Sequence, residues 1–291
     1  MRIQPLVPRL IAALLVSATL LLVDRDARAD RTGAPEPSGS PVRLLAVAEL
    51  GFLAPLDHRV QFGRDGTNFD YVDEGGQDRL FAVARLSIEA HLRRHQLLFL
   101  YQPLELETTA VARRDVRVDD VLFTEGTPMA LRYGFPFYRL TYQYDLLPCP
   151  SRELAVGLAL QLRNATIDFA SLDGSQLASN GGVGVVPLLA ARGRMGIGQG
   201  MWLGFDVVGF YAPVSYINGD DNDVVGAILD ASVRVGVALP HGAEAFVNVR
   251  YLGGGAEGQD DSAVPLDDGY TRNWLHFLFV SLGASIGTPA S

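Results

Sequence analysis

Hydrophobic and polar residues alternate along most of this chain, most regularly between Leu80 and Leu92. All of the even positions in this stretch are apolar, while the odd positions from Arg85 onward are Arg, Ser, Glu and His. Because successive side chains of a strand point to opposite faces, the pattern predicts a β-strand with one apolar and one polar face.

The same alternation recurs in 138–146, 154–162, 227–239 and 243–251. Together with less regular segments it predicts ten strands: 42–62, 79–93, 95–111, 129–146, 152–168, 182–195, 200–215, 223–239, 243–254 and 271–287. Many of these exceed the 5–6 residues of an average globular strand and reach the roughly 9–11 residues that a tilted strand needs to cross a bilayer.

The expected connections alternate between short and long. Short turns fall at 93–95, 147–151, 196–199 and 240–242, and longer loops at 63–78, 112–128, 169–181, 216–222 and 255–270. Short turns at one end and long loops at the other are typical of outer-membrane barrels. An even number of strands places both termini at the short-turn end, which is the periplasmic end of such a barrel.

The pattern therefore predicts an all-β fold, a closed antiparallel up-and-down transmembrane β-barrel of about ten strands, with eight or twelve as the neighbouring counts. A soluble β-sandwich also alternates, with its apolar face inward, so alternation by itself leaves that fold open. Aromatic residues near strand ends are expected to form interfacial girdles. They are Phe135, Phe137, Tyr138, Tyr142, Tyr144, Phe210, Tyr211, Tyr216, Tyr270, Trp274, Phe277 and Phe279.

The first 41 residues have a different character. Arg2 and Arg9 precede an apolar run of about fourteen residues, and Ala27-Arg28-Ala29 follows as an A-x-A cleavage pattern. We expect a secretory signal peptide over 1–29, a flexible Pro-, Gly- and Ser-rich segment over 30–41 and the barrel over 42–288.

With this signal, these strands and an aromatic-containing last strand from Trp274 to Ile286, the chain resembles the small outer-membrane β-barrel proteins of Gram-negative bacteria. The resemblance implies an outer-membrane location, lipid as the surroundings, contact with periplasmic chaperones and the insertion machinery, and a monomer. Such barrels usually end in an aromatic residue, whereas this sequence ends Gly287-Thr288-Pro289-Ala290-Ser291. The assembly signal is therefore expected within 275–279.

The charged residues limit the classes of partner and predict what lines the interior of the barrel. A net charge of −9 argues against nucleic acid, whose phosphates need a basic surface. Charged residues of the polar strand faces are expected to line the lumen and to pair, because an unpaired buried charge is costly. They are Arg85, Glu89, Arg139, Asp145, Arg163, Asp206, Asp230, Arg234, Glu244 and Arg250. Arg–carboxylate bridges among them predict a narrow lumen that obstructs rather than conducts.

Few residues suggest chemistry. His276, in the last strand near its long-loop end, could act as a base with a loop carboxylate such as Asp267 or Asp268, and this is the weak candidate for catalysis. The acidic run with Asp220, Asp221 and Asp223 offers hard oxygen ligands, but it lacks the spacing of a calcium loop and is more often a solvated turn. Cys149 stands alone, so no disulfide, metal site or cofactor is expected.

Three hypotheses of function follow. The first is a porin-like but non-enzymatic outer-membrane barrel with a structural, adhesive or small-solute role. The second is an outer-membrane enzyme, a rim protease or lipid hydrolase, using His276. The third is a soluble periplasmic β-sandwich that binds a ligand.

Overall fold

The computed structural model describes residues 42–147, 149, 151–213, 224–259 and 269–288. The expected signal peptide and flexible segment lie outside this range, as do the candidate metal residues Asp220, Asp221 and Asp223, girdle residue Tyr216 and loop carboxylates Asp267 and Asp268. In the described segments no helix is long and apolar enough to span a membrane.

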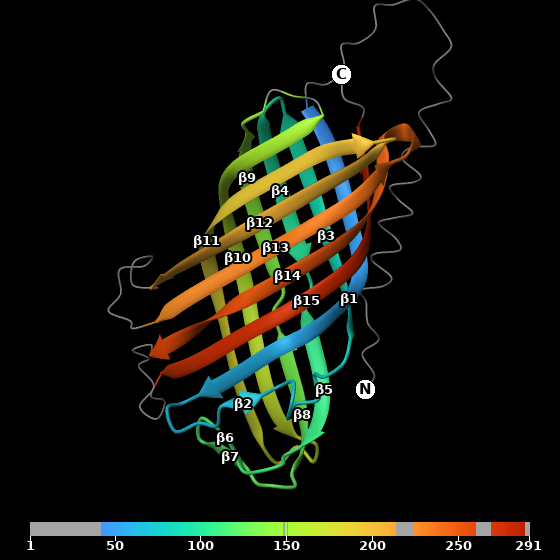
Figure 1. Cartoon of the computed structure of the whole chain (residues 1–291). Coiled ribbons are helices and arrows are strands. Elements are labelled where there is room, and N and C mark those ends of the chain that lie inside the picture. The colour runs from blue at the N-terminus through green and yellow to red at the C-terminus, as the bar shows by residue number, and fades with distance from the viewer. Residues whose placement is uncertain (1–41, 148, 150, 214–223, 260–268, 289–291) are drawn as a thin grey trace, which may run out of the picture. The chain divides into compact units, whose positions relative to one another are not determined.

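The described residues form a closed antiparallel barrel of ten strands, with short extra strands beside it (Figure 1). This confirms the predicted fold and strand number, and it excludes the β-sandwich. The barrel elements are β1 (Val42–Phe62), β3 (Phe81–Leu92), β4 (His95–Gln102) with β5 (Glu105–Val111), β8 (Pro128–Gly134) with β9 (Phe137–Asp145), β10 (Arg152–Ser171), β11 (Leu177–Gly198), β12 (Met201–Pro213), β13 (Val225–Ala238), β14 (Ala243–Gln259) and β15 (Tyr270–Gly287). The extra elements are β2 (Phe69–Asp70), β6 (Val116–Val118) and β7 (Val121–Phe123).

Each strand pairs with its neighbours in sequence, and β1 pairs with β15 to close the ring. Two predicted strands, 95–111 and 129–146, are interrupted. Pro103 separates β4 from β5, and Pro136 separates β8 from β9. Because proline cannot donate a ladder hydrogen bond, the hairpin bends at these two positions and continues beyond them as β5 and β8.

The four short connections lie where the alternation predicted them. Three contain a non-glycine residue with positive φ, Arg93 (55°), Gln199 (52°) and His241 (62°). This backbone conformation lets the chain reverse within two or three residues. At the opposite end, β2, β6 and β7 lie within long connections. The predicted long loop 169–181 is wrong, because β10 continues to Ser171 and β11 begins at Leu177, so only residues 172–176 join them.

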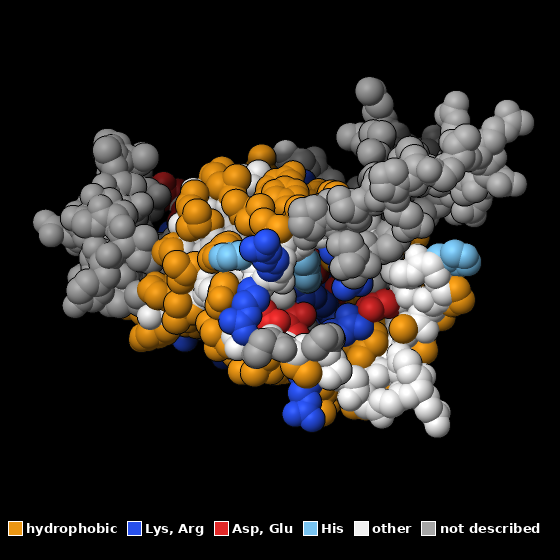
Figure 2. Space-filling model, turned by 90° about the horizontal axis from the view of Figure 1, so that it is seen from above, with side chains coloured by type: hydrophobic (Ala, Val, Ile, Leu, Met, Phe, Trp, Pro, Cys, Tyr) orange, Lys and Arg blue, Asp and Glu red, His pale blue; other side chains and the backbone are white. Residues whose placement is uncertain are grey.

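The outer surface of the barrel is apolar. On β10, Leu158 and Leu160 are 64% and 55% exposed, whereas Ala159 and Gln161 between and beside them are buried. Figure 2 looks onto the end that carries the short turns and shows charged side chains gathered inside a rim of hydrophobic ones. This arrangement is inverted relative to a soluble protein and matches a lipid-facing surface around a polar lumen.

The expected aromatic girdles are only partly present. Tyr138, Tyr142 and Tyr211 are exposed on the outer face. The prediction was wrong for Phe135, Phe137, Phe277 and Phe279, which are buried inside the barrel. Phe277 and Phe279 are buried because side chains alternate between the two faces of a strand, and both share the inward face of β15 with Ser281 and Ser285. Phe210 also packs inward, against a small interior cluster with Val208 and Leu188.

Candidate functional site in the barrel interior

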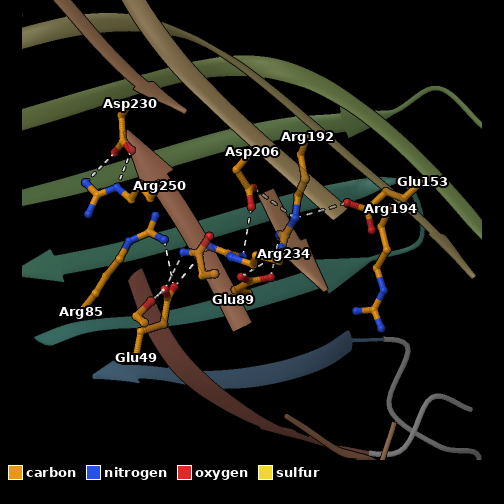
Figure 3. Close-up of polar contacts among 12 residues, drawn as sticks. Glu49, Arg85, Glu89, Glu153, Arg192, Arg194, Asp206, Asp230, Arg234 and Arg250 are labelled. Carbon is orange, nitrogen blue, oxygen red and sulfur yellow. Dashed lines mark hydrogen bonds and ion pairs between the residues drawn. The ribbon is translucent and has the colours of Figure 1, made fainter. Parts of the chain in front are cut away.

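The half of the lumen nearer the short turns is filled by charged side chains (Figure 3). Glu49 of β1 lies at one centre of this network. Its carboxylate accepts hydrogen bonds from Arg85 Nη1 at 3.0 Å, Arg234 Nη2 at 3.3 Å, Asn248 Nδ2 at 2.7 Å and Ser281 Oγ at 3.0 Å. Four donors on different strands therefore satisfy one buried carboxylate, which is what a charge inside a protein requires.

Asp230 of β13 is a second centre. Arg139 Nη1 donates to its Oδ2 at 2.7 Å, and Arg250 binds it through Nε at 2.5 Å and Nη2 at 2.9 Å. The remaining donors of the two guanidinium groups reach Gln161 Oε1 and Gln102 Oε1. All five side chains are buried, so each charge is paired within the lumen rather than solvated.

A third group lies closer to the short turns. Arg192 Nη1 and Nη2 bind the two oxygens of Glu89 at 2.8 and 3.2 Å. Arg192 Nε is 3.4 Å from Asp206, whose other oxygen is 3.0 Å from Arg234. Arg194 forms a separate two-bond pair with Glu244 at 3.0 and 2.6 Å. Such paired contacts fix geometry as well as charge.

These bridges cross the lumen, since they join strands that are not neighbours. Glu89 on β3 binds Arg192 on β11, and Arg139 on β9 binds Asp230 on β13. Two spaces within the network have volumes of about 40 Å³ and about 10 Å³. A water needs roughly 10–15 Å³ of such volume, so each of these spaces has room for a few waters at most.

Towards the long loops, the interior becomes apolar. His58 of β1 is fully buried, stacked on Tyr71 with ring centroids 4.6 Å apart and edge-on to Tyr133 at 4.3 Å and Phe277 at 5.4 Å. Its Nδ1 is 2.8 Å from Gln77 Oε1. Tyr71 and Gln77 come from the loop after β2, so this loop folds inward and packs into the barrel.

Beside this core lies a cavity of about 470 Å³. Its lining is mostly aliphatic, aromatic or glycine and comes from β10 to β15, from β8 and from the link between β8 and β9. The polar side chains on it are Arg163, Asn273 and Tyr133. The volume lies within the range of about 300–1,000 Å³ that is usual for small-molecule sites.

The residues expected in the lumen have three different placements. Eight of the ten belong to the network: Arg85, Glu89, Arg139, Asp206, Asp230, Arg234, Glu244 and Arg250. Asp145 instead lies at the end of β9, where its Oδ1 accepts hydrogen bonds from the backbone nitrogens of Leu147 and Leu154 at 3.0 and 3.1 Å. Arg163 lines the cavity and has no hydrogen bond or ion pair with any residue that the structure describes.

Sequence reasoning missed Glu49, Arg192 and Arg194, and also Glu153, whose Oε1 lies 3.5 Å from Arg192 Nε. The signal for the arginines was present, because Arg192 and Arg194 continue the inward alternation of Leu188 and Ala190 along β11. Glu49 is a single acid on a face that otherwise carries Leu45 and Leu53, so the face reads as apolar.

The weak catalytic candidate lies on the outside of the barrel. His276 shares its face with Val280 and Leu282, which are exposed, and its Nδ1 is 2.5 Å from the Tyr251 hydroxyl on β14. Lipid-facing alternation thus places this pair on the outer wall rather than at a mouth. Over the described ranges, no group of three or more His, Cys, Asp or Glu residues could hold a metal ion.

No family model and no curated protein matches this sequence. Solved structures do match. The proteins that this chain resembles in structure are bacterial outer-membrane β-barrels. They include the outer membrane protease OmpT from Escherichia coli, with 12% identity, a TM-score of 0.49 and coverage of 87% of this chain and 99% of that one.

The attachment invasion locus protein Ail of Yersinia pestis gives 12% identity, a TM-score of 0.33 and coverage of 84% and 99%. Neisserial surface protein A gives 10% identity, a TM-score of 0.30 and coverage of 86% and 99%. These similarities concern the barrel architecture, and the roles of those proteins differ from one another. The activity of this chain must therefore be argued from its own residues.

Proposed function

We propose that this chain is an integral outer-membrane barrel protein with a closed lumen, which serves as a structural and ligand-binding barrel rather than as an open channel. The observation that carries the proposal is the combination of an apolar outer wall with ion pairs that cross the interior. A wall of exposed Leu and Val is stable only against lipid, because monomeric soluble proteins rarely expose large apolar patches. A lumen crossed by buried ion pairs leaves no aqueous path.

The location and processing belong to the same proposal. An N-terminal signal over 1–29 would direct export, both termini would be periplasmic, and the long loops would face the outside. Periplasmic chaperones and the insertion machinery would be the partners during assembly, and the folded protein would be a monomer surrounded by lipid. The mass of the mature protein from outer-membrane fractions tests the cleavage site after Ala29.

Two measurements test the architecture and the closed lumen separately. A folded barrel resists detergent, so its electrophoretic mobility in outer-membrane fractions should change on boiling. Reconstituted into a planar bilayer, the protein should show no large single-channel steps. A band that does not shift, with protein in the soluble periplasm, would overturn the membrane assignment. A large, stable conductance would overturn the closed lumen while leaving the barrel intact.

A further inference from the structure

Among the described residues, β11 and β12 pair along only part of their length, which leaves a gap between them towards the long-loop end. These strands pair from Gly198 and Met201 up to Leu189 and Gly209, and there the pairing stops. β11 continues to Leu177 paired only with β10, and β12 continues to Pro213 paired only with β13. In Figure 1 the lower part of β11 runs away from β12 accordingly.

This opening begins at the level of the lipid-facing surface. In the register of β10 with β11, Leu158 pairs with Leu189 and Leu162 with Val185, and all four side chains are exposed and apolar. The outward face of β10 becomes polar only at Asn164. Unpaired strand edges are costly in hydrocarbon, so a gap at this level is not expected in a barrel that serves only as a support.

The cavity of about 470 Å³ lies directly behind the opening. Val183 to Val186 of β11 and Phe210 of β12, the two edges of the gap, both line it. The opposite wall contains three consecutive glycines, Gly253 to Gly255 of β14. A Cβ on Gly254 or Gly255 would clash with the backbone of Ala227 or Asn273, so the close approach of the neighbouring strands requires glycine here.

One charge faces this apolar space. Arg163 of β10 lies across Gly184 of β11, where a Cβ would come within 3.1 Å of its Nε, and its guanidinium is 5.8 Å from the Phe135 ring. Arg163 Nε and Asn273 Oδ1 are buried without a hydrogen-bond partner in the described structure. Asn273 Nδ2 donates to the Tyr133 hydroxyl at 3.2 Å, which leaves the tyrosine proton able to donate to a ligand.

We infer that this cavity binds an amphiphile with one alkyl chain and an anionic head, which enters from the outer leaflet through the gap between β11 and β12. The head, a carboxylate or phosphate, would pair with Arg163, the natural partner of such oxygens, and accept the Tyr133 proton. The alkyl chain would occupy the glycine-walled space. This inference rests on the membrane location proposed above and supplies the ligand class.

The test uses the full barrel in phosphatidylcholine nanodiscs, with empty nanodiscs subtracted. The probes are 11-(dansylamino)undecanoic acid and its methyl ester, which differ only in the charge of the head. We expect saturable binding of the acid and weaker binding of the ester. This comparison needs no variant, and equal binding of the two probes, or no saturable binding, overturns the inference.

Variants then locate the site. Arg163→Met should weaken binding of the acid about tenfold or more and leave the ester unchanged, while Ala256→Phe, which adds a ring to the lining, should weaken both. Arg117→Met, an exposed arginine of β6, is the matched control and should change neither. Unchanged binding in the first two variants, with a normal heat shift, would place the probe elsewhere.

The route is tested by competition. Oleate, which partitions into the bilayer, should displace the acid probe, whereas octanoate at the same total concentration should displace far less. Equal displacement by octanoate would mean entry from water and would overturn the lateral route. A barrel that shifts on heating and does not conduct, yet binds no probe, would refute this inference alone. A protein absent from the membrane would refute the proposed function first.

Discussion

Arg139 Nη1 lies 2.7 Å from Asp230 Oδ2, and the two residues belong to β9 and β13, which lie on opposite sides of the barrel. Arg250 of β14 binds the same carboxylate. One aspartate therefore connects β9 to β13 and β14, two strands with which β9 shares no backbone hydrogen bond. In a closed sheet, such a contact fixes the distance between opposite walls of the barrel, which strand pairing alone does not do.

We expect Asp230→Asn to destabilise the barrel strongly. The change removes one negative charge and leaves two buried guanidinium groups without a counter-ion, which typically costs about 3–5 kcal/mol. The measurement is the midpoint of urea unfolding in lipid vesicles, with the folded fraction read from the heat-dependent band shift. Asp65→Asn, in an exposed loop, is the control and should leave the midpoint unchanged. Equal midpoints for both variants would show that the pairs around Asp230 contribute little.

The closed lumen predicts the behaviour of a double variant. Replacing both Glu89 and Arg192 by alanine removes the two charges of one bridge together. Asp206 keeps its contact with Arg234, and Glu153 and His91, which each lose one partner, are partly exposed, so the barrel should still fold. The networks around Glu49 and Asp230 and the aromatic core around His58 lie in series with the lost bridge, so planar bilayers should still show no large steps. Porin-like steps from this variant alone would mean that a single bridge closes the barrel.

Outside the barrel wall, Glu74 and Arg114 join two of the long loops. Arg114 Nε and Nη2 bind the two oxygens of Glu74 at 3.0 and 2.9 Å. The hydrogen bonds from Arg114 have the largest effect on the pKa of Glu74 and lower it below its usual value. Partial burial acts in the opposite direction and is the smaller effect.

A carboxyl group whose pKa is lowered in the folded state stabilises the folded loops at every pH above its unfolded-state pKa, which is near 4.3. This stabilisation is lost as the pH falls through the pKa of the folded state. Proteolysis of the loops should therefore accelerate at acid pH in the wild type. Glu74→Gln should be cleaved rapidly already at neutral pH and show less change with pH. Glu125→Gln, an exposed acid nearby, should behave as the wild type. An identical pH profile for Glu74→Gln would remove this pair from the account.

Near the short turns, Gly236 provides the space for an indole. A Cβ on Gly236 would lie 2.4 Å from Trp202 ring atoms, and the Arg194 guanidinium carbon is 4.0 Å from the centroid of the Trp202 ring. Gly236→Val should displace the indole and cost about 1–3 kcal/mol through overpacking. In a Trp274→Phe background, the fluorescence of Trp202, the remaining tryptophan, should shift. Gly182→Val, whose Cβ would meet no atom within 4 Å, is the control.

Much of the barrel could be predicted from the sequence because the side-chain period of a strand is local. The alternation in 227–239 and the turn at 240–242 fix strand direction and faces without knowledge of any partner strand. The bends at Pro103 and Pro136 were missed, although the missing N–H of proline is itself a local signal.

The site was harder to predict because pairing across the lumen is not local. Alternation assigns Arg139 and Asp230 to inward faces, but the register of the whole sheet decides that they meet. The gap between β11 and β12 has no counterpart in the pattern at all. Its β11 edge, with Val183 and Val185 outward, alternates as regularly as a paired strand.

The lipid-facing assignment makes a last prediction with a clear depth dependence. Leu158 is central in the exposed apolar face of β10, whereas Asn164 on the same face follows its end. Leu158→Arg should cost about 2–4 kcal/mol, because a charge near the bilayer midplane is that expensive, and Asn164→Arg should cost close to nothing. Urea titrations in lipid vesicles measure both. If Leu158→Arg were as stable as Asn164→Arg, this face of β10 would not be in contact with hydrocarbon, and the lateral opening beside it could not lead to the membrane.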